Sequence, residues 1–294
     1  MKLGHRTPHL QAGDRVGVVA ASSAFHDPEP LEQGLSLLRS WGLKAEAESI
    51  PQRRWGYLAG SDQERLADLQ GQPNPPLLAC ARGGWGAARL LEQPILWQQG
   101  WLLGFSDVTA LLLARQSAGF DGGIHGPLLS TLAAEPDWSQ QRLRTLLFGG
   151  SVPDLQGSGW VDGIAEGPLI TANLTVASHL LGSAHMPDLD GAILVLEDVG
   201  EQPYRLDRML THWRLTGVLQ RLAGLGFGRF SDCDDDDNPQ EGFSATEVLQ
   251  ERSCDLGIPV IADLPVGHGS EGNAALPIGR KARLDGQHGL LSLL

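Results

Sequence analysis

The chain has 294 residues, about twice the length of a typical single domain, so two domains are expected. Its 41% hydrophobic and 19% charged residues are typical of a globular protein and exclude a coiled coil or a fibre. The net charge of -13 disfavours binding to nucleic acid or to an anionic membrane surface, because both would need a basic face.

The termini and the cysteines give further bounds. The first residues contain no apolar stretch of signal-peptide length, and no later run approaches the ~18 apolar residues of a membrane span, so a cytoplasmic location is expected. Cys80, Cys233 and Cys254 form no CxxC pair, which argues against a disulfide framework and a zinc site. All three are expected to be reduced, with Cys80 buried in a strand.

The first half of the chain alternates between strand and helix patterns. Near-continuous apolar runs predict buried parallel strands within residues 16–21 and 77–81, and a further strand starts at residues 44–47. Helical spacing covers residues 30–41, and a capped helix is expected over residues 61–70. This alternation predicts a doubly wound α/β domain, whose sites lie at the carboxyl ends of its strands.

The second half repeats this kind of pattern after a break. Glycine and proline interrupt residues 136–162, which we interpret as an interdomain connection between an N-terminal domain (1–135) and a C-terminal domain (163–294). Helices are predicted over residues 173–181 and 205–217. A buried strand is predicted over residues 191–196 and ends at Glu197, and a late strand within residues 258–267 leads to His268.

The acidic run at residues 232–237 could suggest calcium. It lacks the glycine and the terminal glutamate of a calcium-binding loop, so a solvated loop is expected.

Ser106 stands at a junction between a strand and a helix. An apolar run, a sharp turn at Gly104 and an apolar helix surround it, which would expose its hydroxyl near backbone N–H groups. The pattern resembles the turn that presents a catalytic nucleophile, but it lacks the second glycine of that motif. The local sequence alone favours a simpler interpretation, in which Ser106 or Asp107 is a helix N-cap.

Two other strand ends carry candidate groups. The glycine-rich residues 82–86 (RGGWG) follow a predicted strand and could present N–H groups to an oxyanion, or simply form a tight turn. Glu197 and His268 each follow an apolar run, although a lone histidine is more often structural. No metal-binding spacing surrounds them, whereas a serine, a carboxylate and a histidine in loops after strands are what a catalytic triad requires.

At this point the sequence resembles the LD-carboxypeptidase family of serine peptidases. Similar motifs occur in order from Gly13-Asp14 to residues 276–279, and they cover nearly the whole chain. Five separated motifs in order are hard to obtain by chance. They lie at residues 82–91 (RGGWGAARLL), 104–111 (GFSDVTAL), 125–127 (HGP), 196–208 (LEDVGEQPYRLDR) and 265–269 (PVGHG).

The resemblance implies a triad of Ser106, Glu197 and His268. Glu201 competes with Glu197 for the acidic role, and Glu197 is preferred because it directly follows the apolar run. The resemblance also implies an oxyanion hole built from the backbone N–H groups of Gly84 and Asp107. Family members often have tyrosine where this chain has Trp85 and Phe105, which puts specificity in doubt more than chemistry.

A carboxypeptidase must also hold a substrate carboxylate. Arg82 is the first candidate, ahead of Arg205 and Arg208, and Trp85 and His125 are expected to contact substrate as well. Alternatively, Arg208 could form a surface pair with Asp207 or Glu201.

The architecture implied by the family is a flavodoxin-like or Rossmann-like N-terminal α/β domain and a C-terminal α/β domain, with the site in the cleft between them, in a homodimer. The implied reaction removes the terminal D-alanine from muropeptide tetrapeptides during peptidoglycan recycling, without a metal or cofactor. The alternatives are hydrolysis of peptidyl or aminoacyl nucleotide antibiotics, as in self-immunity, and a non-catalytic protein that binds a small ligand.

Overall fold

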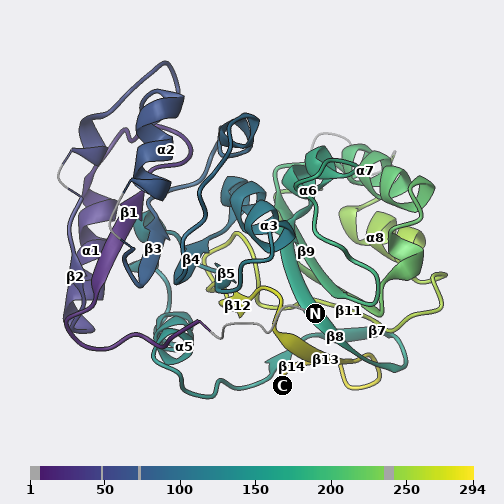
Figure 1. The fold of residues 1–294 in the computed structure, drawn as a ribbon. Coiled ribbons are helices and arrows are strands. Elements are labelled where there is room, and N and C mark those ends of the chain that lie inside the picture. The colour runs from purple at the N-terminus through teal and green to yellow at the C-terminus, as the bar shows by residue number, and fades with distance from the viewer. Residues whose placement is uncertain (1–6, 48, 72–73, 235–241) are drawn as a thin grey trace. The chain divides into compact units, whose positions relative to one another are not determined.

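The computed structural model describes residues 7–47, 49–71, 74–234 and 242–294, and the chain divides into two compact units. The first unit comprises Met1–Val152, Ala184–Pro187 and Ala274–Ile278, and the second comprises Pro153–Ser183, Asp188–Asn273 and Gly279–Leu294. Each unit has its own sheet and helices (Figure 1), which confirms the predicted α/β class. The range 136–162, predicted as a connection, holds a helix of the first unit and two short strands of the second.

The first unit is built on a sheet with the strand order β12-β5-β4-β3-β1-β2. Its parallel strands are β1 (Arg15–Val19), β2 (Lys44–Ala45), β3 (Leu77–Cys80), β4 (Trp101–Gly104) and β5 (Gly123–His125). The edge strand β12 (Leu276–Pro277) is antiparallel to β5. The parallel order 2-1-3-4-5 is that of flavodoxin-like sheets, in which ligands bind where the loops after β1 and β3 diverge.

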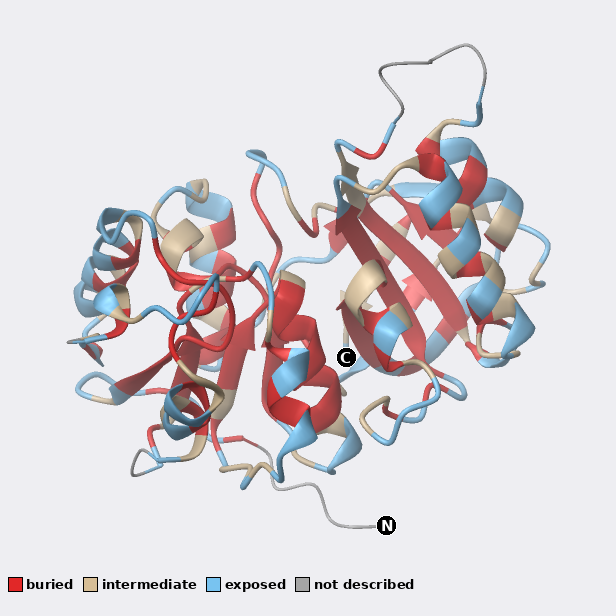
Figure 2. Cartoon of the chain, turned by 90° about the horizontal axis from the view of Figure 1, so that it is seen from above, coloured by how far each residue is buried: buried red, intermediate tan, exposed pale blue. Residues whose placement is uncertain are grey.

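Helices cover the sheet of the first unit, so most residues of its strands are buried (Figure 2). The α-helices are α1 (Glu29–Ser40), α2 (Asp62–Gln70), α3 (Thr109–Ser117), α4 (Leu129–Leu132) and α5 (Asp137–Leu147). Short 3-10 helices are η1 (Ile50–Gln52), η2 (Ala88–Glu92) and η3 (Ser106–Val108). The predicted cap of α2 is confirmed as a reciprocal capping box between Ser61 and Glu64. Cys80 lies fully buried in β3, as its apolar surroundings predicted.

The second unit is built on a sheet with the order β6-β14-β13-β8-β9-β10-β11-β7. Its central strands are parallel, and antiparallel strands flank them on both sides. The bounds are β6 (Leu155–Gln156), β7 (Ser158–Val161), β8 (Ile164–Asn173), β9 (Ile193–Val199), β10 (Gly224–Ser231), β11 (Val260–Ala262), β13 (Lys281–Asp285) and β14 (Leu290–Leu293).

The helices of this unit are α6 (Leu174–Leu180), α7 (Pro203–Leu215), η4 (Leu219–Arg221) and α8 (Ala245–Ser253). The apolar face of α7 is buried through Leu206, Leu210 and Trp213. The indole N–H of Trp213 donates to Ser178 Oγ of α6 over 2.8 Å, which satisfies the polar atom of a fully buried ring. This contact fixes α6 against α7 (Figure 1).

The strand predicted over residues 191–196 continues further than expected. Glu197 and Asp198 lie inside β9, where Glu197 pairs with Asn173 of β8 and Asp198 pairs with Phe230 of β10. Charged residues end most buried strands, but both of these side chains find buried hydrogen-bond donors and so tolerate the position. Glu197 is therefore paired directly with β8, while its neighbours Leu196 and Asp198 pair with β10.

Two further findings bear on the sequence analysis. Residues 235–237 of the acidic run lie outside the described residues. Within the described part, Asp234 Oδ1 accepts a 2.7 Å hydrogen bond from the N–H of Ala245 at the start of α8. Among the described residues, no helix is both long and apolar enough to cross a membrane.

Candidate active site

Ser106 lies in a strained turn directly beyond β4. Its φ of 61° falls in the left-handed region that residues other than glycine rarely adopt. A Cβ on Gly104 would lie 2.6 Å from Val108 Cγ1, so the strand can turn this sharply into η3 and α3 only at a glycine. The capping residues of η3 and α3 are Phe105 and Val108, so neither Ser106 nor Asp107 is the N-cap that the sequence left open. Strain of this kind is typical of turns that present a nucleophile.

The glycine-rich loop after β3 packs against this turn. A Cβ on Gly83 would lie 3.2 Å from both Oγ and Cβ of Ser106, so the loop backbone lies beside the serine hydroxyl. Gly84 has a φ of 108°, and a Cβ there would lie 2.3 Å from Ser23 Oγ. Ser23 Oγ in turn accepts a 3.0 Å hydrogen bond from the N–H of Trp85. The loops after β1, β3 and β4 therefore meet at the carboxyl ends of their strands, where this sheet order predicts a site.

The side chain of Asp107 ties these three loops together. The carboxylate is buried, and its Oδ2 accepts hydrogen bonds from Ser22 Oγ at 2.6 Å and from the N–H of Ala87 at 2.8 Å. Gly86 contributes a further backbone hydrogen bond. Burial raises the pKa of Asp107, while these hydrogen bonds and the nearby Arg65 oppose that rise. The residue after the candidate nucleophile thus fixes the position of the glycine-rich loop.

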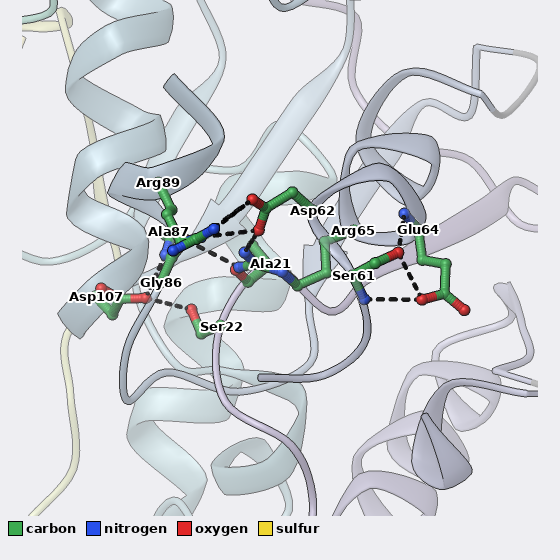
Figure 3. Close-up of polar contacts among 10 residues, drawn as sticks. All are labelled: Ala21, Ser22, Ser61, Asp62, Glu64, Arg65, Gly86, Ala87, Arg89 and Asp107. Atoms are coloured by element: carbon green, nitrogen blue, oxygen red, sulfur yellow. Dashed lines mark hydrogen bonds and ion pairs between the residues drawn. The ribbon is translucent and has the colours of Figure 1, made fainter. Parts of the chain in front are cut away.

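Arg65 of α2 holds the same loop from the opposite side (Figure 3). Its side chain is fully buried and donates to the carbonyl oxygens of Ala21 and of Gly86, the latter at 2.9 Å. Asp62 pairs with Arg65 and also accepts from Arg89, which keeps the buried guanidinium compensated. Arg65 and Asp107 therefore hold Gly86 and Ala87 between two opposite charges.

In the second unit, Glu197 and His268 form a close pair. Nδ1 of His268 lies 2.7 Å from Oε2 of Glu197, and the backbone N–H of His268 donates to the same oxygen at 3.3 Å. A Cβ on Gly267 would lie 2.7 Å from this oxygen, so glycine is needed for the loop to approach the carboxylate. Because an ionised carboxylate only accepts, Nδ1 carries the proton and Nε2 carries the lone pair of the neutral ring.

The loop that carries His268 is fixed by several hydrogen bonds. Ser231 Oγ donates to the carbonyl of His268 at 2.8 Å, and the N–H of Gly267 donates to Asn273 Oδ1 at 2.9 Å. Arg229 donates to the carbonyls of Gly267 and Gly272. The ring is therefore oriented by its backbone as well as by Glu197, as a general base requires.

Glu201, the other acidic candidate, has a different partner. Its Oε2 lies 3.4 Å from Arg205 Nη1, one turn into α7. Glu197 is fully buried, whereas Glu201 lies in the loop after β9 and is partly exposed. The structure thus pairs His268 with Glu197.

The other predicted residues of the first unit are Arg82, Trp85 and His125. Arg82 donates to the carbonyl of Ala24 at 2.8 Å and lies over the Phe25 ring, and burial lowers its pKa. Trp85 is 67% exposed beside the glycine-rich loop. His125 is fully buried and packs edge-on against Phe105 at 5.7 Å, which places it beneath the turn of Ser106.

Several residues of this region escaped sequence analysis. Ser22 and Ser23 lie near the start of the loop after β1, where the strand order predicts a site, so their position was a usable signal. Arg65 gave no signal, because an arginine in an amphipathic helix is usually exposed. Arg229 and Asn273 act only through the folded loop around His268, so no local pattern indicates them.

Comparison with known proteins agrees with the resemblance seen in the sequence. The LD-carboxypeptidase N-terminal domain matches residues 16–126, and the LD-carboxypeptidase C-terminal domain matches residues 166–284. The chain belongs to the LD-carboxypeptidase family. A carboxypeptidase-named protein of Synechocystis is 47% identical over 97% of this chain and 96% of its own length. The murein tetrapeptide carboxypeptidase of Pseudomonas aeruginosa is 35% identical over 92% of this chain and 93% of its own length.

Solved structures of this LD-carboxypeptidase fold are also similar. The muramoyltetrapeptide carboxypeptidase of Oxalobacter formigenes has a TM-score of 0.82 and 26% identity, and the match covers 95% of this chain and 97% of that one. The microcin self-immunity protein MccF, solved with aspartyl sulfamoyl adenosine, has a TM-score of 0.82 at 19% identity, with 97% of each chain covered. The likeness to MccF shows a shared two-domain fold.

The pKa of His268 predicts the acid limb of a pH profile. Burial of the ring lowers this pKa, but the hydrogen bond and charge of Glu197, with the charge of Asp198, raise it more, so the net shift is upward. A general base must be neutral, and activity is therefore lost as the pH falls through the raised value. We expect the acid limb of kcat/KM to have its midpoint above 6.5, the ordinary value for histidine. A midpoint below 6.5 would contradict this arrangement.

Separate substitution of Glu197 and of Glu201 tests which glutamate orients His268. We expect Glu197→Gln to lower kcat by ~10⁴, by analogy with loss of the acid in other triads, and to move the acid limb to lower pH. Glu201→Gln removes only a partly exposed ion pair and should cost less than about tenfold. A larger loss of kcat at Glu201 than at Glu197, measured on one tetrapeptide, would show that the acid is misassigned.

Removal of the Asp107 carboxylate tests its hold on the glycine-rich loop. Asp107→Ala leaves buried donors at Ser22 and Ala87 unsatisfied, each at a cost of about 1–3 kcal/mol, and should lower both Tm and kcat. Asp107→Asn keeps an acceptor oxygen and should retain more of both. Asp162→Ala removes an exposed carboxylate and serves as the control. Equal kcat for Asp107→Ala and the control would refute a positioning role.

Proposed function

We propose that the chain is a serine-type LD-carboxypeptidase, which removes the terminal D-alanine from murein tetrapeptides. The main support for this substrate is the 35% identity, over nearly the whole chain, to the murein tetrapeptide carboxypeptidase of Pseudomonas aeruginosa. The strained Ser106 turn and the Glu197–His268 pair support serine chemistry. We further propose that the enzyme acts in the cytoplasm during peptidoglycan recycling, as a homodimer.

In the proposed mechanism, Ser106 Oγ attacks the carbonyl carbon that precedes D-alanine. Nε2 of His268 takes the hydroxyl proton, which requires the two atoms to come within about 2.6–3.2 Å. Glu197 accepts from Nδ1–H throughout and so stabilises the imidazolium that forms. The short Nδ1 to Oε2 distance and the burial of Glu197 support this assignment of roles.

The tetrahedral intermediate places negative charge on the former carbonyl oxygen. We assign the backbone N–H groups of Gly84 and Asp107 as its donors, each of which would contribute about 3 kcal/mol to the transition state. The packing of the glycine-rich loop against Ser106 and the anchoring of that loop by Asp107 and Arg65 support this assignment.

Collapse of the tetrahedral intermediate reverses the first proton transfer. The imidazolium gives its proton to the amine of D-alanine as the C–N bond breaks, which leaves an acyl group on Ser106 Oγ. Water then loses a proton to Nε2 and attacks the ester, and the serine leaves with that proton. The residues of this chain supply every proton transfer in the cycle.

A panel of tetrapeptides, pentapeptides and aminoacyl nucleotides, offered as substrates, tests this function directly. Wild-type protein should release D-alanine from a tetrapeptide, while Ser106→Ala should lose at least about 10³-fold in kcat and keep its Tm, because removing one half-buried hydroxyl changes the packing of the turn little. Pentapeptides and aminoacyl nucleotides complete the panel, with product masses measured. Turnover of Ser106→Ala at the wild-type rate would end the serine mechanism. Selective cleavage of the aminoacyl nucleotides would replace the proposed substrate.

A further inference from the structure

A cavity of about 350 Å³ lies beside α7 in the second unit. Thr175, Glu201, Tyr204, Arg205 and Arg208 are among its lining residues. We call it the α7 cavity. Its walls come from α6, from the first two turns of α7 and from the loop that follows β9. The two helices lie side by side on one face of the second sheet (Figure 1).

Positive charge collects on one face of α7 at this cavity. Arg205 and Arg208 are three residues apart on the helix, and both guanidinium groups lie over the ring of Tyr204, at 5.8 and 5.7 Å from its centre. Arg205 also donates to the Tyr204 hydroxyl and contacts Glu201 at 3.4 Å. Glu201 thus compensates Arg205, while the ring of Tyr204 orients both arginines.

Arg208 has a different environment. Its neighbour Asp207 lies 3.5 Å from Arg252 and accepts from Thr211, so that carboxylate is directed to other partners. Within the described residues, the Arg208 guanidinium has no ion pair, and neither surface pair that the sequence allowed is formed. A cation of this kind, held over an aromatic ring in a protein with a net charge of -13, is suited to bind a carboxylate.

The α7 cavity lies at the same end of the sheet as His268. The N–H of Gly200, next to Glu201, donates to the carbonyl of Ser231 at 2.9 Å, and Ser231 Oγ donates to the carbonyl of His268 at 2.8 Å. Successive side chains of a strand point to opposite faces. Glu197 reaches His268 on one face, and Asp198 accepts from Thr175 of the cavity on the other. The cavity therefore lies at the carboxyl end of β9, on the opposite face of the strand from the Glu197–His268 pair.

We propose that the α7 cavity binds a carboxylate on the part of the peptide that stays behind, with Arg208 as its main contact, and not the carboxylate of the departing D-alanine. This inference rests on the proposed function, since it takes the ligand to be the substrate peptide. It assigns Arg208 a role in affinity rather than in chemistry.

Binding to the inactive Ser106→Ala protein tests this inference without turnover. Two tetrapeptides are titrated calorimetrically, one with a free carboxylate on an upstream residue and one with a carboxamide at the same place. In the Ser106→Ala background, Arg208→Gln should weaken binding of the carboxylate peptide roughly tenfold and leave the carboxamide peptide unchanged. Arg221→Gln is the control, because Arg221 is an exposed arginine that pairs with Asp190 at 2.6 Å.

Each outcome of the titrations decides the inference. An Arg208-dependent preference for the carboxylate peptide supports it, even if wild-type protein fails to hydrolyse the peptide and the proposed function falls. Equal effects of Arg208→Gln on both peptides, or an effect no larger than that of Arg221→Gln, would overturn it. Citrate is titrated as a free anion, and Arg208-dependent binding of citrate alone would also overturn the assignment to the peptide.

Discussion

The hydrogen bond between Glu197 and His268 is the constraint around which the second unit is organised. Removing a carboxylate from water costs several kcal/mol, so the protein must return hydrogen bonds to a fully buried Glu197. Oε2 receives both Nδ1–H and the backbone N–H of His268, and Gly267 leaves room for that approach. Strand pairing on both sides of β9 then limits the movement of the carboxylate, and the imidazole bonded to that carboxylate is held in place with it.

In the first unit, a strained turn positions the side chain of Ser106, whereas in the second unit a buried pair positions that of His268. Ser106 adopts a left-handed conformation whose cost is of order 1–3 kcal/mol, and its surroundings must enforce it. Val108 packs against Gly104 on one side, and Asp107 and Arg65 bind the glycine-rich loop on the other. The same contacts that enforce the turn also hold the glycine-rich loop beside the serine. Strain and candidate oxyanion site therefore have one structural origin.

Sequence reasoning reached the α/β class because parallel strands are continuous apolar runs, as in β3 and the first half of β9. The order of motifs in the chain also singled out Ser106, Glu197 and His268 as a proposed triad, and the structure brings the last two into contact. It ended β9 too early, because carboxylates normally end buried strands and only the folded protein supplies the partners of Glu197 and Asp198. Arg65 and the role of the Asp107 side chain depend on loops that are far apart in sequence, so no periodicity could indicate them.

In the proposed mechanism, the hydroxyl of Ser106 is activated by a histidine that Glu197 orients. The most direct measurement is the rate of covalent labelling by a fluorophosphonate, followed by peptide mapping. We expect one label on Ser106 of the wild-type protein at neutral pH, no label in Ser106→Ala, and a rate lowered by several orders of magnitude in His268→Ala. Labelling of another residue, or an unchanged rate in His268→Ala, would contradict the account.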